Sequence, residues 1–261
     1  RRYAHHVTVD VDNGMRYLGR PLVRQLGASV KDVLACRLSE LGERWQVVLG
    51  SRSDPYDRYE QVIRLCESRA SRLSFFFLLR GGTTYDHATS PMHPVMRSRI
   101  RSVAENAEVG IHPSYVTSDD AERTAHEIGV LGGIIDRPVR SSRQHFLRWR
   151  FPETLHQLER MGIIEEHSIG ASDRVGFTAG TCTPFPFYSI AEERLTAITL
   201  HPFALMDSAL HDHLGLSVEQ AFAEYAACID AVRAVEGTLI TVWHDRFLAG
   251  ALLPAAWLVQ A

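Results

Sequence analysis

The stretch Thr8-Val9-Asp10-Val11-Asp12-Asn13 places two carboxylates at the end of a short apolar segment that runs from His6 to Val11. This segment predicts a β-strand, and Asp10 and Asp12, two residues apart, lie on the same face of it. Two neighbouring carboxylates repel each other unless a cation or a shared proton lies between them. The pair therefore indicates one metal ligand and one base, although an Asx-rich turn after a strand explains the same residues about equally well in isolation.

Short apolar strands alternate with longer helical patterns along the rest of the chain, which is typical of an α/β fold. Later strands are predicted at Leu73–Leu79, Val109–His112, Val139–His145, Ile163–Ile164, Ala197–Leu200 and Thr238–Trp243. Helices are predicted at Pro21–Leu41, Tyr56–Ser68, Val95–Asn106, from Ser118 to Ile135, from Pro152 onward and at Val218–Val235. The segments Arg80–Pro94 and Gly176–Tyr188 are predicted as loops. No repeat or linker interrupts the pattern, so we expect one domain covering residues 1–261.

Ionisable side chains stand where several of the predicted strands end. They are Asp10 and Asp12, His112, Arg143 and His145, and His244 with Asp245. In a parallel β/α barrel the working groups lie at the carboxyl ends of the strands, so we expect these side chains to converge on one rim. Carboxylates, imidazoles and a guanidinium together indicate a metal-dependent hydrolase. Taken singly, each has a plainer interpretation, such as a His bonded to a loop carbonyl or a solvated Arg on a surface strand.

Composition excludes several other classes of protein. The net charge of −3 argues against a nucleic acid or an anionic membrane surface as the main partner. Four cysteines without CxxC spacing support neither a zinc knuckle nor a disulfide framework. No apolar run is long enough to span a bilayer. No signal peptide is evident, which slightly favours the cytoplasm, but the chain begins Arg1-Arg2-Tyr3 without Met, so an upstream segment and export both stay open.

The same strand ends carry a family resemblance that spans nearly the whole chain. In order and spacing they resemble the motifs of a bacterial branch of the NodB-homology polysaccharide deacetylases, the family-four carbohydrate esterases. The stretches that carry the resemblance are Thr8–Asp12, Glu108–Tyr115 (EVGIHPSY), Ser142–Arg148 (SRQHFLR), Gly176–Tyr188 (GFTAGTCTPFPFY), Met206-Asp207 and Val242–Asp245 (VWHD). The resemblance implies a distorted (β/α) barrel of seven strands that hydrolyses the N-acetyl group of an amino sugar or polysaccharide.

Residue roles follow from this resemblance position by position. Asp10 matches the catalytic base, and Asp12 and His112 match metal ligands. Arg143 matches the Arg that orients the base, and His244 matches the general acid. The implied cofactor is a divalent metal, for which Zn²⁺ fits a His/His/Asp set best, while Co²⁺, Mn²⁺ and Ni²⁺ fit the same ligand types.

Two positions depart from the family pattern. The second metal-binding His, expected four residues after His112, is replaced by Val116, whose side chain cannot coordinate a metal. His145 stands where the family has Pro, and it is our candidate for the third metal ligand. The alternative is a site that binds metal weakly or is inactive. Glu166 stands near a position where the family often has Asp, and we assign it no role.

Aromatic residues and further histidines complete the set of candidates. Tyr115, Phe146, Phe185 and Tyr188 are predicted to contact the substrate, and the backbone N–H near Phe146 to stabilise the oxyanion. Loop packing explains Phe185 and Tyr188 equally well. Two further groups of histidines stand outside these motifs. A solvated loop is the favoured interpretation of His201, His211 and His213 with Asp207 and Asp212, and a second cation site is the alternative. His5 and His6 are interpreted as a surface pair or a tag remnant.

Two alternative functions remain open. The first is a carbohydrate-binding barrel that has lost catalysis, for which Val116 is the main argument. The second is a metal-dependent amidase that acts on a small non-sugar amide, since related barrels resemble allantoin and imide hydrolases. The glycan, the acyl group and the oligomeric state are not indicated by the sequence.

Overall fold

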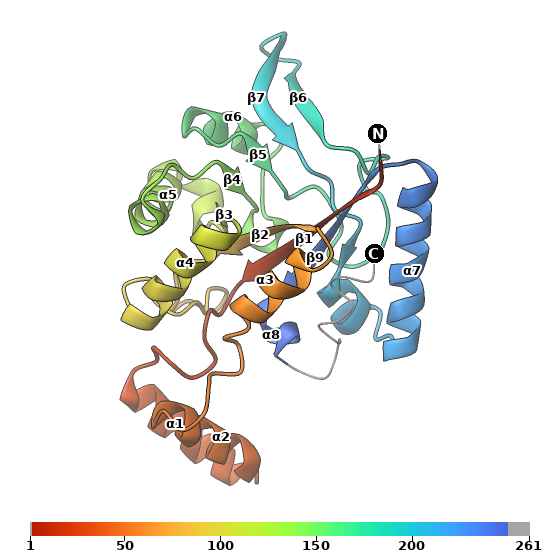
Figure 1. Ribbon diagram of the computed structural model, residues 1–261. Coiled ribbons are helices and arrows are strands. Elements are labelled where there is room, and N and C mark those ends of the chain that lie inside the picture. Colours follow the sequence, from red (N-terminus) through yellow and green to blue (C-terminus); the bar gives the residue numbers. More distant parts are fainter. Residues whose placement is uncertain (1, 250–261) are drawn as a thin grey trace.

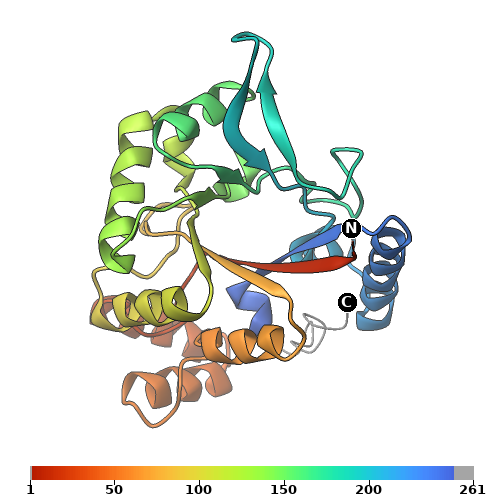
Figure 2. The ribbon, with the colours of Figure 1, turned by 45° about the horizontal axis from the view of Figure 1, so that its top comes forward.

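The computed structural model describes residues 2–249, which form one curled, mostly parallel sheet with helices outside it (Figure 1 and Figure 2). The strand order is β6-β7-β5-β4-β3-β2-β1-β9-β8, and only β6 runs antiparallel to its neighbour. The strands are β1 (Ala4–Val11), β2 (Arg72–Phe77), β3 (Glu108–Ile111), β4 (Ser141–Ser142), β5 (Glu165–Glu166), β6 (Phe185–Ser189), β7 (Arg194–Leu200), β8 (Leu205–Met206) and β9 (Thr238–His244). The helices are α1 (Leu22–Leu34), α2 (Leu38–Val48), α3 (Tyr59–Glu67), α4 (Pro94–Asn106), α5 (Ala121–Ile135), α6 (Glu153–Arg160), α7 (Val218–Ala234) and α8 (Asp245–Leu248).

The predicted α/β class and distorted barrel are confirmed, with nine strands in the described sheet where seven were expected. The difference has two sources. Strands β4, β5 and β8 are two residues long, too short for periodicity to define them. Strand β6 falls at the end of the segment predicted as the loop Gly176–Tyr188. Pro184 and Pro186 favoured a loop there, but Pro is tolerated in a strand at the edge of a sheet.

Two further elements differ from their predicted bounds. The helix expected at Pro21–Leu41 is a hairpin of α1 and α2, broken at Cys36, whose backbone adopts a left-handed φ of 54°. The strand expected at Val139–His145 pairs only at Ser141–Ser142 and is followed by a 3-10 turn, His145–Leu147. Arg143 and His145 therefore do not share a strand face, as predicted, but lie on the segment just beyond β4.

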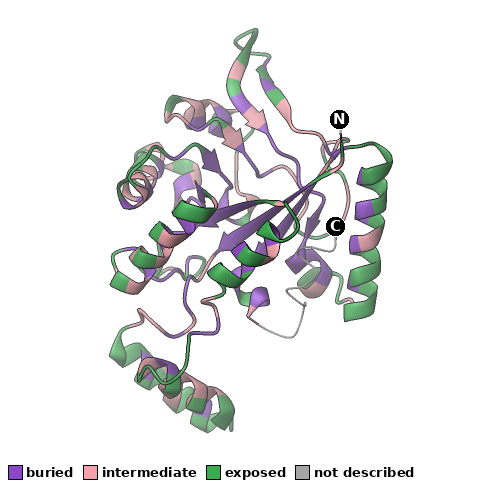
Figure 3. Cartoon of the chain, in the orientation of Figure 1, coloured by how far each residue is buried: buried purple, intermediate pink, exposed green. Residues whose placement is uncertain are grey.

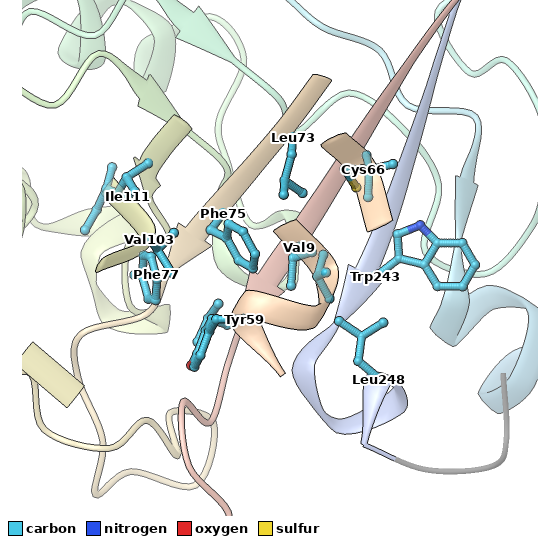
Figure 4. Packing of buried hydrophobic residues seen from close by; sticks show 14 of the residues in the cluster. Val9, Tyr59, Cys66, Leu73, Phe75, Phe77, Val103, Ile111, Trp243 and Leu248 are labelled. Carbon is cyan, nitrogen blue, oxygen red and sulfur yellow. The ribbon is translucent and has the colours of Figure 1, made fainter. Parts of the chain in front are cut away.

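Successive side chains along the strands point to opposite faces of the sheet, and both faces are buried. One set of residues faces the helices and forms the outer core, in which Val9, Phe75 and Phe77 pack against Tyr59 of α3 (Figure 4). The buried strands appear purple at the centre of Figure 3, with exposed helix faces around them. The other set faces the inside of the curled sheet. Because side chains alternate along β1, Val9 belongs to the outer core and Asp10 to the barrel interior.

The α1–α2 hairpin projects away from the barrel (Figure 1) and carries apolar side chains on its surface. The most exposed of them on α1 are Leu22, Val23, Val30 and Leu34. Ion pairs of Asp32 with Arg37 and Arg44 tie the two helices together. Within residues 2–249, no helix is both long enough and apolar enough to cross a membrane.

Candidate active site

The predicted site residues converge at the carboxyl ends of the central strands. Asp10 on β1 lies beside His244 on β9 in the parallel register. His112 follows β3 directly, and its backbone N–H donates to the carbonyl oxygen of Phe77 at the end of β2. The side chains enclose a cavity of about 400 Å³, lined by Asp10, Asp12, His112, Gln144, His145, Phe146, Leu147, Ser172, Met206, Ser208, Asp212, His213, His244 and Arg246.

Asp12, His112 and His145 present three potential metal ligands to one point. Their ligand atoms all lie within 4.8 Å of one another. The Asp12 Oδ1 atom is 3.4 Å from His112 Nε2 and 3.8 Å from His145 Nε2. It is buried and has no hydrogen-bond partner within residues 2–249. Burial alone favours the neutral acid, but the imidazoles of His112, His244 and His145 outweigh it and hold the pKa of Asp12 far below its usual range.

The imidazoles of His112 and His145 are each oriented by a hydrogen bond at Nδ1, the nitrogen that faces away from Asp12. His112 Nδ1 lies 2.5 Å from the carbonyl oxygen of Arg143, to which it donates. His145 Nδ1 lies 3.1 Å from Asp86 Oδ1. When Nδ1 carries the proton, Nε2 is left with a lone pair that faces Asp12. Asp86 escaped the sequence analysis because it lies within the loop Arg80–Pro94, where no periodic pattern indicates which side chains turn inward.

Asp10 forms a buried ion pair with Arg143. Arg143 Nη1 donates to Asp10 Oδ1 at 2.9 Å and to the hydroxyl of Thr8 at 2.7 Å, and its Nε donates to the carbonyl oxygen of His167 at 3.0 Å. The guanidinium is fully buried and packs on the ring of Phe76. These contacts hold the Asp10 carboxylate in place at the mouth of the barrel.

His244 is held by a second carboxylate, Asp207, which follows β8. Both the ring Nδ1 and the backbone N–H of His244 bond to the Asp207 carboxylate, at 2.5 and 2.6 Å. Burial disfavours the charged imidazole, but Asp207 first, then Asp12 and Asp10, raise the pKa of His244 to about 10. His244 Nε2 is 3.9 Å from Asp12 Oδ2 and faces the cavity. Met206-Asp207 was among the motifs of the family resemblance, so the sequence did carry a signal for this partner, although we assigned it no role.

The turn that follows Asp12 is fixed by Asp245. This carboxylate accepts hydrogen bonds from the backbone N–H groups of Asn13 and Gly14, at 2.9 and 2.7 Å, and from the side chain of Asn13. Gly14 has a φ of 74°, and a Cβ there would lie 2.7 Å from the sulfur of Met96. The left-handed backbone favours glycine, and a Cβ would also displace the Met96 side chain. Asp245 therefore positions the loop that carries Asp12.

Phe146, in the 3-10 turn, lines the cavity, whereas Tyr115 and Tyr85 contact the Phe146 ring without lining the cavity themselves. Tyr115 stacks on Tyr85 at 4.0 Å between ring centroids, and Phe146 meets both rings edge to face. Phe146 has a left-handed φ of 57°, and its side chain is 62% exposed. Tyr85, in the loop Arg80–Pro94, was missed by the sequence analysis for the same reason as Asp86.

Phe185 and Tyr188 are not brought to this site. They lie on β6, the outermost strand, and neither lines the cavity. Because β6 runs antiparallel to β7, Tyr188 lies beside Leu195 near the start of β7, away from the carboxyl ends of the strands, and its hydroxyl bonds Glu193. The loop cluster considered around His201 also does not assemble. His211 bonds Asp212 and Asp207 bonds His244, whereas His201 is buried inside the barrel.

Comparisons with known proteins support the fold. No protein-family model and no curated protein matches the chain. Among solved structures, a candidate polysaccharide deacetylase from Mycobacterium smegmatis superimposes with a TM-score of 0.63 and 15% identity, covering 100% of this chain and 82% of that one. Puue allantoinase gives a TM-score of 0.60 at 12% identity, with coverage of 98% and 82%. A candidate polysaccharide deacetylase from Pseudomonas aeruginosa gives 0.59 at 12% identity, with coverage of 98% and 83%.

The chain thus has the fold of the polysaccharide deacetylases, and the resemblance seen in the sequence is confirmed at that level. The allantoinase has the same fold. Identities of 12 to 15% establish the architecture and leave the reaction to be argued from the site itself.

Proposed function

We propose that the protein is a metal-dependent hydrolase that removes an N-acyl group, in the first instance N-acetyl, from an amino sugar or a polysaccharide. The observation that carries the proposal is one cavity that joins three potential metal ligands, an ion-paired carboxylate and a carboxylate-bound imidazole. These are the groups needed to activate water, to stabilise a tetrahedral intermediate and to protonate an amine.

Asp12, His112 and His145 would hold the metal. Two imidazole nitrogens and a carboxylate oxygen suit Zn²⁺, and three protein ligands leave a position open, as in hydrolytic zinc sites. Asp12 Oδ1, buried without a partner within residues 2–249, is the donor that a cation would satisfy. When bound, a divalent ion supplies Lewis acidity, which polarises the amide carbonyl and makes water easier to deprotonate.

Asp10 accepts the proton of the attacking water in this proposal. Arg143 Nη1 binds Asp10 Oδ1 at 2.9 Å and leaves Oδ2 free of that bond. Asp10 Oδ2 lies 3.9 Å from His112 Nε2, so the base stands beside the proposed metal ligands without replacing one of them. Because Arg143 is fixed by Thr8 and by the His167 carbonyl oxygen, the carboxylate is held in a single orientation.

His244 donates a proton to the departing amine nitrogen. Its Nδ1 bond to Asp207 directs Nε2 toward the cavity and stabilises the imidazolium. The raised pKa means that the proton is present at neutral pH and is available as the C–N bond breaks. The backbone N–H of Phe146 remains the proposed donor to the oxyanion, with Tyr115 and the Phe146 ring as the surface for a sugar ring.

A small non-sugar amide is the second candidate substrate. The cavity of about 400 Å³ is at the small end of the range for ligand sites, and an allantoinase shares the fold. The aromatic group of Tyr85, Tyr115 and Phe146 beside the cavity favours a sugar over a small imide, because stacking on a pyranose ring uses a broad apolar surface.

The test is hydrolysis by protein purified without a His tag, with its metal content measured on the same sample. A panel should hold N-acetylated amino sugars, their oligomers, and cyclic imides and ureides. Release of acetate that depends on added metal supports the proposal. Turnover of the imides alone would assign the second function. A protein with full metal occupancy and no turnover on either group would contradict both hydrolase functions.

A further inference from the structure

Three imidazoles meet inside the barrel, away from the cavity described above. His6 is on β1, His167 follows β5, and His201 follows β7. The ring centroids of His6 and His167 are 5.5 Å apart, and those of His167 and His201 are 4.2 Å apart with the rings nearly parallel. The three residues are 1%, 0% and 4% exposed, so the sequence-based interpretations of His6 as a surface residue and of His201 as part of a solvated loop are wrong.

Most of the polar atoms in this cluster lack a partner. Within residues 2–249, neither ring nitrogen of His167 and neither ring nitrogen of His201 has a hydrogen bond. His6 Nε2 bonds the Ser74 hydroxyl at 2.8 Å. Burying a polar atom without a hydrogen-bond partner costs about 1–3 kcal/mol. Four such atoms close together would therefore destabilise the folded state considerably. A cluster of this kind indicates a ligand that all three side chains share.

This cluster is separate from the proposed catalytic centre. His6 precedes Asp10 by four residues on the same strand, which places them about 13 Å apart along β1. Arg143 lies between the two groups, because its Nη1 bonds Asp10 and its Nε bonds the carbonyl oxygen of His167. The ring of Phe76 packs against both the Arg143 guanidinium and the His167 ring.

We propose that His6, His167 and His201 bind a second divalent transition-metal ion, with Zn²⁺ the ion that three imidazoles suit best. Their ligand atoms already lie within 4.8 Å of one another. Three nitrogens at 2.0–2.1 Å from a tetrahedral zinc ion would be separated by about 3.4 Å, so side-chain rotations that unstack His167 from His201 are enough to close the site.

The charges around the cluster are compatible with a cation. The nearby guanidinium groups of Arg72 and Arg143 are each paired, Arg72 with Glu108 and Glu165, and Arg143 with Asp10. Glu165 Oε2 is 3.8 Å from His167 Nε2 and places a negative charge next to the imidazoles.

A surface hollow lies at the amino end of the strands. Arg72, Glu108 and Glu165 line this hollow and are partly exposed. Exposed ion pairs of this kind contribute at most about 1 kcal/mol, so their side chains exchange partners readily. Because the ligands come from β1 and from the segments after β5 and β7, a bound ion would tie opposite sides of the curled sheet together. The role that follows is structural.

The number of ions per chain tests the proposal. Untagged protein should be stripped with a chelator, reloaded with Co²⁺ or Zn²⁺, passed through a desalting column and assayed for metal. Wild-type protein is expected to hold two ions per chain, and a His112→Ala/Asp12→Ala protein one. His201→Phe, which keeps a ring of similar size, should also hold one, while the same change at the exposed His126 should leave two. The second site would be overturned if the wild type held one ion and the His112→Ala/Asp12→Ala protein held none. It would also be overturned if His201→Phe held two ions.

A measurement on the wild type alone covers the case in which His201→Phe fails to fold. Anomalous diffraction at the zinc edge from crystals soaked in Zn²⁺ should give a peak about 2.0–2.1 Å from nitrogens of His6, His167 and His201. A peak beside Asp12 with none between the three buried histidines overturns the proposal while leaving the proposed catalytic metal intact. The reverse pattern would support the second site and count against the first.

Discussion

Asp10 and Asp12 differ in their surroundings although they share a face of β1. Asp10 is bound by a guanidinium, whereas Asp12 Oδ1 faces two imidazoles and has no hydrogen-bond partner in the described chain. We therefore expect Asp10→Asn to abolish turnover while metal remains bound, because an amide cannot accept the proton of water. Metal content and acetate release should be measured on the same preparations. Asp12→Asn is the matched control and should lose the metal; equal loss of metal in both variants would show that the two roles are assigned wrongly.

His244 and Asp207 act as a unit in the proposed mechanism. His244→Ala should lower the turnover rate by about 10²–10⁴-fold, the usual contribution of a general acid, with little change in metal content. Asp207→Asn should move the alkaline limb of the rate–pH profile to lower pH, because Asp207 is the first of the groups that raise the pKa of His244 to about 10. An active His244→Ala enzyme, or an unchanged alkaline limb in Asp207→Asn, would remove the pair from the mechanism.

His145 is the proposed third metal ligand, at a position where the family has Pro. Its Nε2 is 3.8 Å from Asp12 Oδ1, and its Nδ1 is bonded by Asp86. Loss of a residue that orients a ligand typically weakens metal binding by about 10–100-fold, which is the effect expected of Asp86→Asn. His145→Ala, which removes the ligand itself, should weaken binding further. Competition against a chelator of known affinity measures both, and affinity unchanged from wild type in His145→Ala would place His145 outside the metal site.

The sequence predicted which residues at the strand ends would lie at the site. It did not predict the residues that hold those side chains in place. Asp10, His112 and His244 end or directly follow strands with clear apolar runs, so their convergence follows from parallel pairing. Asp86 reaches the site from a loop without periodicity, and its inward orientation depends on tertiary contacts. The bland interpretations of His6 and His201 failed because a buried polar cluster contradicts the usual preference of histidine for partly exposed positions.

At the scale of elements, the hydrophobic periodicity of the sequence does not show which way the side chains of the shortest strands face. Glu166 on β5 is fully buried, where it accepts hydrogen bonds from the hydroxyls of Ser142 on β4 and Ser168. Sequence periodicity covers too few residues in a two-residue strand to show that this carboxyl group faces inward. The helix break at Cys36 escaped prediction for a related reason, since the apolar pattern of Pro21–Leu41 continues across it.

Glu166 should make the stability of the β4–β5 region depend on pH. Burial, only partly opposed by the serine hydroxyls, raises the pKa of Glu166 from 4.5 to about 7. The folded protein then holds this proton more tightly than the unfolded chain does. Its stabilising effect is complete below pH 4.5 and is lost as the pH rises through 7, a loss of about 3 kcal/mol.

Glu166→Gln removes the titration and tests this expectation. Urea unfolding of wild type and variant at a series of pH values should show the free energy of unfolding of the wild type falling between pH 4.5 and about 7, relative to that of Glu166→Gln, and levelling off above. Glu105→Gln, at an exposed position of α4, is the control that should leave the pH dependence unchanged. Parallel curves for wild type and Glu166→Gln would show that Glu166 has an ordinary pKa.

At the scale of the whole molecule, the proposed metal ligands tie together strands that are far apart in the sequence. Asp12 follows β1, His112 follows β3 and His145 follows β4, so one ion would fix the carboxyl ends of three strands. A ligand that binds only the folded state stabilises it by about 2.7 kcal/mol at a concentration one hundred times Kd. For a chain of this size, 1 kcal/mol corresponds to about 2–4 °C in Tm. Adding zinc at that excess to chelator-treated protein should therefore raise Tm by about 5–11 °C for each occupied site.

The two clusters can be separated in the same experiment. The Asp12→Ala/His112→Ala protein should retain only the shift due to His6, His167 and His201. The His201→Phe protein should retain only the shift due to Asp12, His112 and His145. Calcium, which prefers oxygen ligands, should produce no comparable change and controls for a general effect of divalent ions. If zinc leaves the Tm of the wild type unchanged at saturating concentration, neither cluster binds metal in the folded state. The barrel would then be held by its outer core alone, and the carboxylate and imidazole groups at its mouth would have to act without a metal.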